Sequence, residues 1–196
     1  MFNDLTSLPR YLSTRRSGKP RDLIAPGPDE PSLRDILALA ARTPDHGKLF
    51  PWRFVPIGDD ARSAFGALLR KAFTTANPEA REIQIEAAIA PAFMAPSLVV
   101  LLYAPQPSPK IPLWEQQLSV GAAAMNLLHA AHAYGFAGSW ITGWAAYDPI
   151  VRAELCEGDE EIAGFFYIGT PANPLEERPR PELDTIIRHW PKPTAA

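Results

Sequence analysis

Apolar residues recur at helical spacing in several parts of the chain. One amphipathic helix is predicted to begin near Asp29 or Ser32, either of which can cap its first turn. It ends near Arg42, because Pro44 disfavours helix before it. Its apolar positions follow the spacing i, i+3, i+4, i+7 and i+8: Leu33, Ile36, Leu37, Ala40 and Ala41. This spacing places them on one buried face, and the stretch 61–73 repeats the pattern.

The best-defined helix is predicted from about Trp114 to Tyr134. Its centre, residues 121–128, is small and apolar on nearly every side, and a helix that is apolar all round is buried. Because small side chains let backbones approach closely, we expect this helix to pack against other helices or a second subunit. Gly135 follows it and suits the C′ position that ends a helix.

Two further segments are predicted to be helical. The first is a short helix from Leu5 to Arg16, which the following Gly and Pro residues end. The second runs from Asn77 to Met94 and ends among prolines.

Four segments favour strands. Leu98 to Tyr103 is a continuous β-prone apolar run, which predicts a central strand. Phe54 to Ile57 is a short strand that Pro56 places toward a sheet edge. Ser139 to Thr142 and Ile162 to Thr170 also favour strands.

Proline is unusually frequent, with 22 of 196 residues, about twice the average share. Much of the chain is therefore expected to be loops and extended arms. We expect one domain over residues 1–196, since neither internal repeats nor a clear domain break is visible. The proline-rich tail, about 171–196, is predicted to be an extended arm that lies across a partner.

Composition narrows the class of protein. The chain is 46% hydrophobic and 21% charged, near the average for soluble globular proteins. Its formal net charge of −3 argues against non-specific nucleic-acid binding, which needs a basic excess. The single cysteine, Cys156, excludes an intramolecular disulfide framework and a multi-cysteine metal site, and it fits a reducing compartment. With no bilayer-spanning apolar run and no signal peptide, we expect a cytoplasmic protein without membrane association.

Several common catalytic motifs are missing from the sequence, including a P-loop, G-x-G-x-x-G and G-x-S-x-G. His129 and His132 share one helical face and could in principle hold a metal, but neither a third nor a fourth ligand lies near them in sequence. A structural role for both is favoured, and we predict no metal site. Cys156 is interpreted as a small buried hydrophobe.

A distributed set of cations remains. Arg15-Arg16-Ser17 lies where the first helix meets a loop, and Lys19 follows two residues later. Guanidinium forks pair with phosphate, and a serine hydroxyl adds a further donor. Arg42 ends the next helix and is followed closely by His46. Composition alone favours an anion site and a solvated basic patch about equally.

Six short motifs occur between Tyr11 and Pro171 in a specific order. They are Arg15-Arg16-Ser17, Arg42-Thr43-Pro44-Asp45-His46, Pro51-Trp52-Arg53-Phe54, Trp114-Glu115-Gln116, Gly135-Phe136-Ala137-Gly138-Ser139-Trp140 and Gly164-Phe165-Phe166-Tyr167-Ile168-Gly169-Thr170-Pro171. Each motif alone is weak, whereas the ordered set resembles the nitroreductase family of FMN enzymes. The resemblance is strongest to its short bacterial NAD(P)H nitroreductase-like branch.

The resemblance implies an α+β fold with a mixed, mostly antiparallel sheet flanked by helices. It also implies an intertwined homodimer with one FMN in each of two clefts between the subunits. The small-residue helix agrees with close packing across a large interface.

The resemblance further implies which residues hold the cofactor. Arg15-Arg16-Ser17 corresponds to the segment that binds the FMN phosphate and ribityl chain, and Lys19 to a cation close to the flavin. The tail residues Arg178 or Arg180 could add phosphate contacts, although they match the family pattern poorly.

A second group of positions corresponds to contacts with the flavin ring. Arg42 and His46 match FMN-contacting positions, with the His46 loop supplied by the other subunit. Trp140, Ile141 and Thr142 match a segment that lies along the ring.

Two positions depart from the family pattern. Phe50 replaces a common glutamine, and Ile141 replaces a common polar or basic residue. Both changes make the predicted pocket less polar, so they bear on the substrate more than on FMN binding.

The function implied is a ping-pong transfer from NAD(P)H to the flavin and then to an electron-poor acceptor such as a nitroaromatic or quinone. No acid–base residue is assigned, although His46 could donate a proton or could simply hydrogen-bond the cofactor. Another flavin reaction, such as dehalogenation or dehydrogenation, and a non-catalytic flavin-binding dimer remain alternatives.

Overall fold

A computed structural model describes residues 1–190 of the chain. Within them, five strands form one sheet in the order β1–β5–β3–β2, and β4 also pairs with β5. The strands are β1 (Leu23–Ile24), β2 (Trp52–Ile57), β3 (Ser97–Tyr103), β4 (Ala137–Ile141) and β5 (Glu161–Pro171). The α+β class and the antiparallel character of the sheet are confirmed. The expectation of a mixed sheet is corrected, because every strand pair in residues 1–190 is antiparallel.

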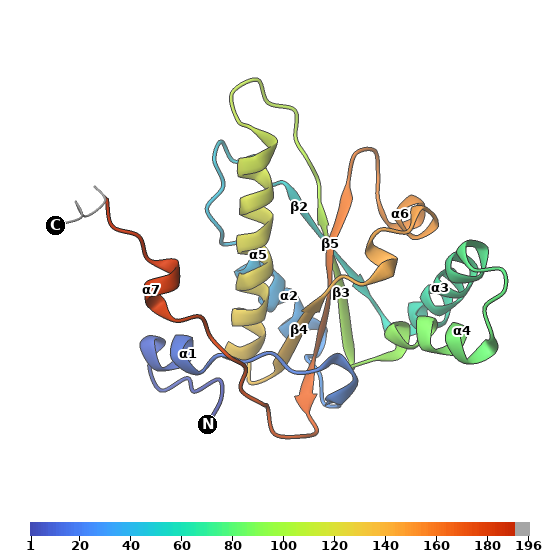
Figure 1. Ribbon diagram of the computed structural model, residues 1–196, viewed down its shortest axis with the longest axis horizontal. Helices are drawn as coiled ribbons and strands as arrows, with labels where there is room; N and C mark the ends of the chain where they lie inside the picture. Colours follow the sequence, from blue (N-terminus) through green and yellow to red (C-terminus); the bar gives the residue numbers. More distant parts are fainter. Residues whose placement is uncertain (191–196) are drawn as a thin grey trace.

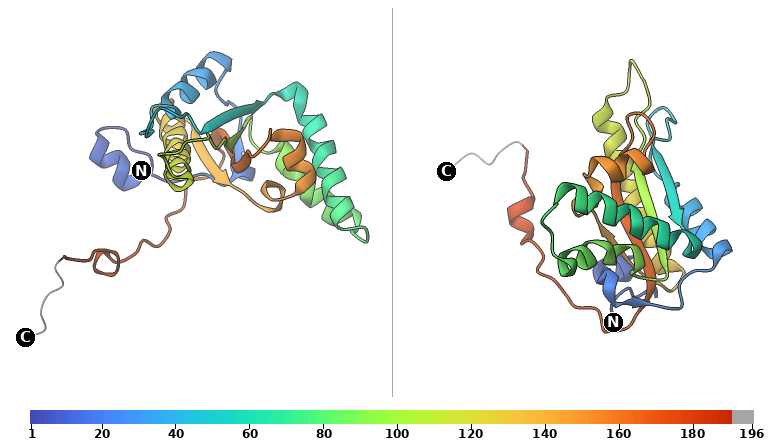
Figure 2. Two further views of the ribbon diagram at one scale, coloured as in Figure 1. Left: turned by 90° about the horizontal axis from the view of Figure 1, so that it is seen from above. Right: turned by 90° about the vertical axis from the view of Figure 1, so that its right-hand side faces the viewer.

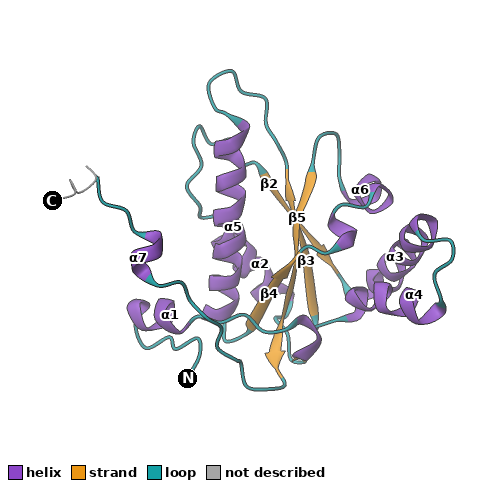
Figure 3. Ribbon diagram, viewed as in Figure 1, coloured by secondary structure: helices purple, strands orange, loops and turns teal. Residues whose placement is uncertain are grey.

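Helices cover both faces of the sheet. They are α1 (Leu8–Thr14), α2 (Glu30–Ala40), α3 (Arg62–Ala76), α4 (Glu82–Ile89), α5 (Leu113–Ala133), α6 (Pro149–Leu155) and α7 (Leu183–Ile186). Figure 1 shows α2 and α5 on one side of the strands and α3, α4 and α6 on the other, and the views in Figure 2 agree. Coloured by secondary structure, the sheet is the middle layer between the two groups (Figure 3).

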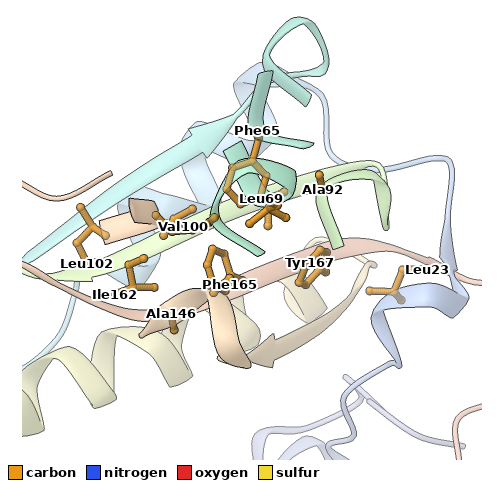
Figure 4. Close-up of a cluster of buried hydrophobic side chains, with 14 of the residues drawn as sticks. Leu23, Phe65, Leu69, Ala92, Val100, Leu102, Ala146, Ile162, Phe165 and Tyr167 are labelled. Atoms are coloured by element: carbon orange, nitrogen blue, oxygen red, sulfur yellow. The ribbon is translucent and has the colours of Figure 1, made fainter. Parts of the chain in front are cut away.

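The central strand β3 explains this three-layer arrangement. All its residues are buried, and alternate side chains point to opposite faces of a strand. Leu98, Val100 and Leu102 therefore join the core beneath α3 and α6, where Phe65 of α3 packs against Phe165 of β5 (Figure 4). The alternate residues of β3 join the core beneath α2 and α5: Val99, Leu101 and Tyr103.

Most predicted elements appear close to their expected bounds. The small-residue helix is α5, and Gly135 after it has a φ of 84°, as a C′ glycine requires. The strand that contains Pro56 is β2, which lies at one end of the sheet order. Proline is tolerated there because an edge strand has one side free of ladder hydrogen bonds.

Two predictions need correction. The expected helix from Asn77 to Met94 is shorter, because Asn77 leaves the helical conformation before Pro78 and α4 begins only at Glu82. The helix α6 is not predicted at all. Its start is encoded by Asp148, whose carboxylate accepts hydrogen bonds from the Ile150 and Val151 N–H groups.

The segment after β5 leaves the body of the molecule. It passes α1, forms the short helix α7 and is exposed from Glu176 to Trp190 (Figure 1). The expected arm at about 171–196 begins at this point, and its last residues, 191–196, lie outside the described part of the chain.

Candidate functional site

The segment from Arg15 to Lys19 lies against the sheet. It follows α1, and the Gly18 N–H donates a hydrogen bond of 3.0 Å to the carbonyl oxygen of Gly138 on β4. A Cβ atom at Gly18 would lie 2.7 Å from Cδ2 of Leu23, so the close approach favours glycine at this position. The predicted anion-binding residues are thereby placed beside the first residues of β4.

Positive charges gather around Arg15. The charges of Arg16, Arg178 and Arg180 all lower the pKa of the Arg15 guanidinium, although its partial burial is the larger cause. Arg180 Nη2 also donates to the Arg15 carbonyl oxygen at 3.4 Å, and Arg15 Nη1 donates to Ser17 Oγ at 3.5 Å. The structure thus brings both tail arginines to the predicted phosphate segment. Close guanidinium groups repel one another unless an anion lies between them.

Carboxylates from the tail already pair with part of this cluster. Glu176 Oε2 lies 2.9 Å from Lys19 Nζ, and the Glu176 carbonyl accepts a hydrogen bond of 2.5 Å from Arg16 Nε. Glu177 lies 3.8 Å from Arg16 and 3.2 Å from Arg180. The Lys19 ammonium lowers the pKa of Glu176. These contacts border a 170 Å³ pocket, and they show that its cations accept anionic groups.

The end of β4 carries the residues predicted to lie along a flavin ring. Trp140 is 40% exposed, but its indole is held: it stacks on Phe166 with ring centroids 5.5 Å apart. Its Nε1 donates to the Ala163 carbonyl oxygen at 3.1 Å. Gly164 makes room for this ring, because a Cβ there would lie 2.2 Å from Trp140 Nε1.

Ile141 and Thr142 turn toward the opposite face of the sheet from Trp140. Both line a small apolar niche of 60 Å³ whose walls include Phe65 and Phe165. Thr142 is two strand steps beyond Trp140 and four beyond Gly138, or about 13 Å along an extended chain from the hydrogen bond that anchors Gly18. The cation cluster and the end of β4 are therefore separated by only a few strand residues.

Arg42 and His46 lie elsewhere. The loop that contains them runs along α5: Asn126 Nδ2 donates to the Arg42 carbonyl, and His46 Nδ1 lies 2.6 Å from Glu115 Oε2. Glu115, the partner of His46, lies fourteen positions before His129, or about 21 Å along the helix axis from the end beside the cation cluster. Asn126, the partner of Arg42, lies only three positions before His129. Within residues 1–190, no hydrogen bond or ion pair connects either residue to the segment 15–19.

Sequence reasoning missed the environment of the two histidines on α5. His129 and His132 both meet the hydroxyl of Tyr11, at 2.6 and 2.8 Å from their Nδ1 atoms. The spacing of the histidines indicates a shared face, but nothing in the sequence points to Tyr11, 118 residues away. In the described residues, no group of three or more His, Cys, Asp or Glu side chains is arranged to hold a metal.

Among residues 1–190 no helix combines the length and apolar character that crossing a membrane requires.

Comparison with known proteins identifies the family. The model of the "Nitroreductase family" matches residues 12–170. The chain is 36% identical over 161 residues to "Putative NAD(P)H nitroreductase YdjA" of Escherichia coli (strain K12), covering 82% of this chain and 86% of that protein.

Solved structures share the fold. A nitroreductase-like family protein from Bacillus cereus has a TM-score of 0.80 at 19% identity, covering 97% of this chain and all of that one. The FMN and NADPH-dependent nitroreductase NfnB of sphigopyxis sp. strain HMH has a TM-score of 0.71 at 20% identity, covering 94% of this chain and 99% of that one. With a family model matched over most of its length and a relative above 30% identity, the chain belongs to the nitroreductase family.

Proposed function

We propose that the protein is an FMN-dependent oxidoreductase that takes reducing equivalents from NAD(P)H. The observation that carries the proposal is that the segment with Arg15, Arg16 and Ser17 lies beside the first residues of β4. The family membership supports it, as do the FMN and NADPH dependence of NfnB and the NAD(P)H in the name of the Escherichia coli relative.

The residues of the site fit a flavin phosphate. Arg15 and Arg16 supply guanidinium groups, Ser17 a hydroxyl and Lys19 an ammonium, and the tail arginines add positive charge. A dianionic phosphate at this point would relieve the repulsion among these cations. It would also replace the carboxylate of Glu176, which holds Lys19 in the present structure.

Beyond the phosphate, β4 provides the surface for the ring. Trp140, locked against Phe166 and Ala163, offers a rigid wall on one face of the strand, and the partly exposed Ile141 and Thr142 lie on the opposite face. The chemistry that bound FMN would supply is to accept a hydride from NAD(P)H and then to pass two electrons to a second substrate.

The position of His46 supports a homodimer. One chain holds His46 beside Glu115, about 21 Å along α5 from the end of the helix that lies beside its own cation cluster. A second copy packed along α5 would bring its own 42–46 loop to the site. The exposed apolar side chains on this helix agree, because Trp114 is 65% and Leu118 is 53% exposed.

The electron acceptor is proposed to be an electron-poor aromatic compound or quinone that enters the cleft after the oxidised nicotinamide leaves. Phe50, which is 57% exposed, and Ile141 give the proposed entrance an apolar character. His46 Nδ1 lies 2.6 Å from Glu115 Oε2, and an imidazole held in this way could donate a proton or contact the cofactor.

An absorbance spectrum of the purified protein tests the proposal, recorded before and after anaerobic addition of NADPH. We expect a yellow protein whose flavin absorbance is bleached. A protein that stays yellow with both NADPH and NADH would contradict the assigned electron donor. A colourless protein that also fails to bind added FMN would overturn the proposal as a whole.

A further inference from the structure

The hydroxyl of Tyr11 joins two helices that are far apart in the sequence. It lies 2.6 Å from Nδ1 of His129 and 2.8 Å from Nδ1 of His132, so α1 is tied to α5. Tyr11 is 6% exposed and His132 is 2% exposed. The proposed function assigns no role to these three side chains.

Hydrogen-bond chemistry gives this contact a direction. A phenol has one proton, so Tyr11 donates to one imidazole and accepts from the Nδ1–H of the other. The Nε2 atom of His132 is buried without a partner. An unpaired buried N–H is rarer in proteins than an unpaired acceptor. We therefore assign Nδ1–H to His132, which donates to Tyr11, while Tyr11 donates to His129.

The placement of α1 depends on this contact. The helix has only seven residues, too few to be stable alone, and Tyr11 is its one buried residue. Arg15 is the C-cap of the same helix, one turn after Tyr11. The charge of Arg15 acts on Tyr11, His129 and His132 alike, which indicates that its guanidinium lies close to all three.

We infer that Tyr11, His129 and His132 form a positioning cluster that sets where Arg15 presents its guanidinium to the flavin phosphate. The inference rests on the proposed function, because Arg15 matters only if it binds that phosphate. The three residues touch neither flavin nor substrate. They act through the helix end that carries Arg15.

The Tyr11→Phe variant tests this inference by comparing FMN with riboflavin, which lacks the phosphate. We expect its FMN affinity, measured by quenching of flavin fluorescence, to fall about tenfold, as loss of one or two hydrogen bonds implies. Riboflavin affinity should change by less than about twofold, since Arg15 does not meet a phosphate there. The matched control is Tyr134→Phe, which removes a hydroxyl bound to Asp35 near the C-terminal end of α5 and should leave both affinities unchanged.

The Arg15→Gln variant separates failure of this inference from failure of the proposed function. If it binds FMN as tightly as the wild type, the phosphate assignment itself is wrong. If it weakens FMN binding and Tyr11→Phe does not, the cluster does not position Arg15. Equal losses of FMN and riboflavin in Tyr11→Phe also contradict the inference, because they indicate general damage to the fold.

A pair of substitutions at His132 keeps the test decisive if Tyr11→Phe folds poorly. The amide nitrogen of His132→Asn stands near the position of Nδ1 and can still donate to Tyr11. We expect it to keep FMN affinity within about threefold of the wild type, whereas His132→Leu, which lacks the donor, should lose about tenfold. Equal FMN affinities in these two variants would overturn the inference.

Discussion

At the scale of single residues, the site depends on side chains that the backbone holds in one orientation. Trp140 shows this most directly, because its indole stacks on Phe166 and donates to Ala163. The space for this ring exists because residue 164 is glycine. A rigid Trp140 in turn gives the end of β4 a defined surface.

The Gly164→Ala variant should therefore lose stability and disturb the proposed ring site. Its Cβ would lie 2.2 Å from Trp140 Nε1, so the indole or the strand must shift. We expect the free energy of unfolding to fall by about 1–3 kcal/mol, measured by urea denaturation. Gly58→Ala is the matched control, because its Cβ would meet only the flexible Asp60 carboxylate. Equal stability of the two variants would contradict this explanation.

His132 should make stability depend on pH. Its pKa is lowered from 6.5 to about 4, first by burial and then by the charges of Arg15 and His129. Below pH 6.5 the unfolded chain therefore binds a proton that the folded chain does not, and the folded state loses relative stability until about pH 4. The loss amounts to at most about 3 kcal/mol over this window.

The comparison that isolates this effect is between the wild type and His132→Asn. The amide does not titrate, so the variant should lose less stability than the wild type in denaturant titrations between pH 7 and pH 4.5. Tyr11, Arg15 and His129 face the group in both proteins and contribute equally. Parallel pH profiles would show that His132 does not control the effect.

At the scale of elements, short helices depend on their first turns. The helix α6 has seven residues, and the buried carboxylate of Asp148 accepts from two of its N–H groups at 2.8 and 3.1 Å. The N-cap of α2, Asp29, is exposed and accepts from one. Burial and the second bond make the α6 cap the stronger of the two.

The Asp148→Ala variant should accordingly lower the free energy of unfolding by about 1–2 kcal/mol, as loss of a strong N-cap does. Asp29→Ala should produce a smaller loss because water can replace its single hydrogen bond. Thermal and urea denaturation of both variants measure the difference. A larger loss in Asp29→Ala would mean that burial of the cap does not decide its strength.

At the scale of the whole molecule, residues of the tail contact the cation cluster. Glu176 pairs with Lys19 and borders the 170 Å³ pocket, so its carboxylate competes with any phosphate that binds there. The pair is exposed, and water and salt weaken it. Its effect on binding should be measurable but modest.

The Glu176→Gln variant should therefore bind FMN more tightly, by about two- to fivefold at low salt, and the gain should shrink at high salt. Glu182→Gln changes the charge of the tail equally at a residue without an ion pair to the cluster and serves as the control. Isothermal titration with FMN at two salt concentrations measures both. Equal gains in the two variants would indicate a general charge effect.

The proposed second subunit leads to another expectation. Leu118→Glu places a charge in the exposed apolar stretch of α5, where packing against another copy would bury it. We expect sedimentation analysis to show that this variant is a monomer, and we expect the same samples to have lost bound FMN. A monomeric variant that retains its flavin would contradict a site shared between subunits.

Features of the fold could be predicted from the sequence where the interactions behind them join residues close together in the chain. The apolar run of β3, the small residues of α5 and the edge position of Pro56 depend on neighbours in the sequence, so local patterns reveal them. The shortened α4 and the missed α6 also have local causes, in Pro78 and Asp148, and closer attention to turn and cap residues would have found them.

The sequence by itself thus determined most of the helices and strands, the family resemblance and the cations of Arg15-Arg16-Ser17 and Lys19. Only the tertiary structure decided that Tyr11 reaches His129 and that Glu176 pairs with Lys19. It also decided that the 42–46 loop lies along α5 and that His46 lies beside Glu115. The physical reason is that periodicity and capping act within a few residues, whereas these contacts form only when packing brings distant segments together.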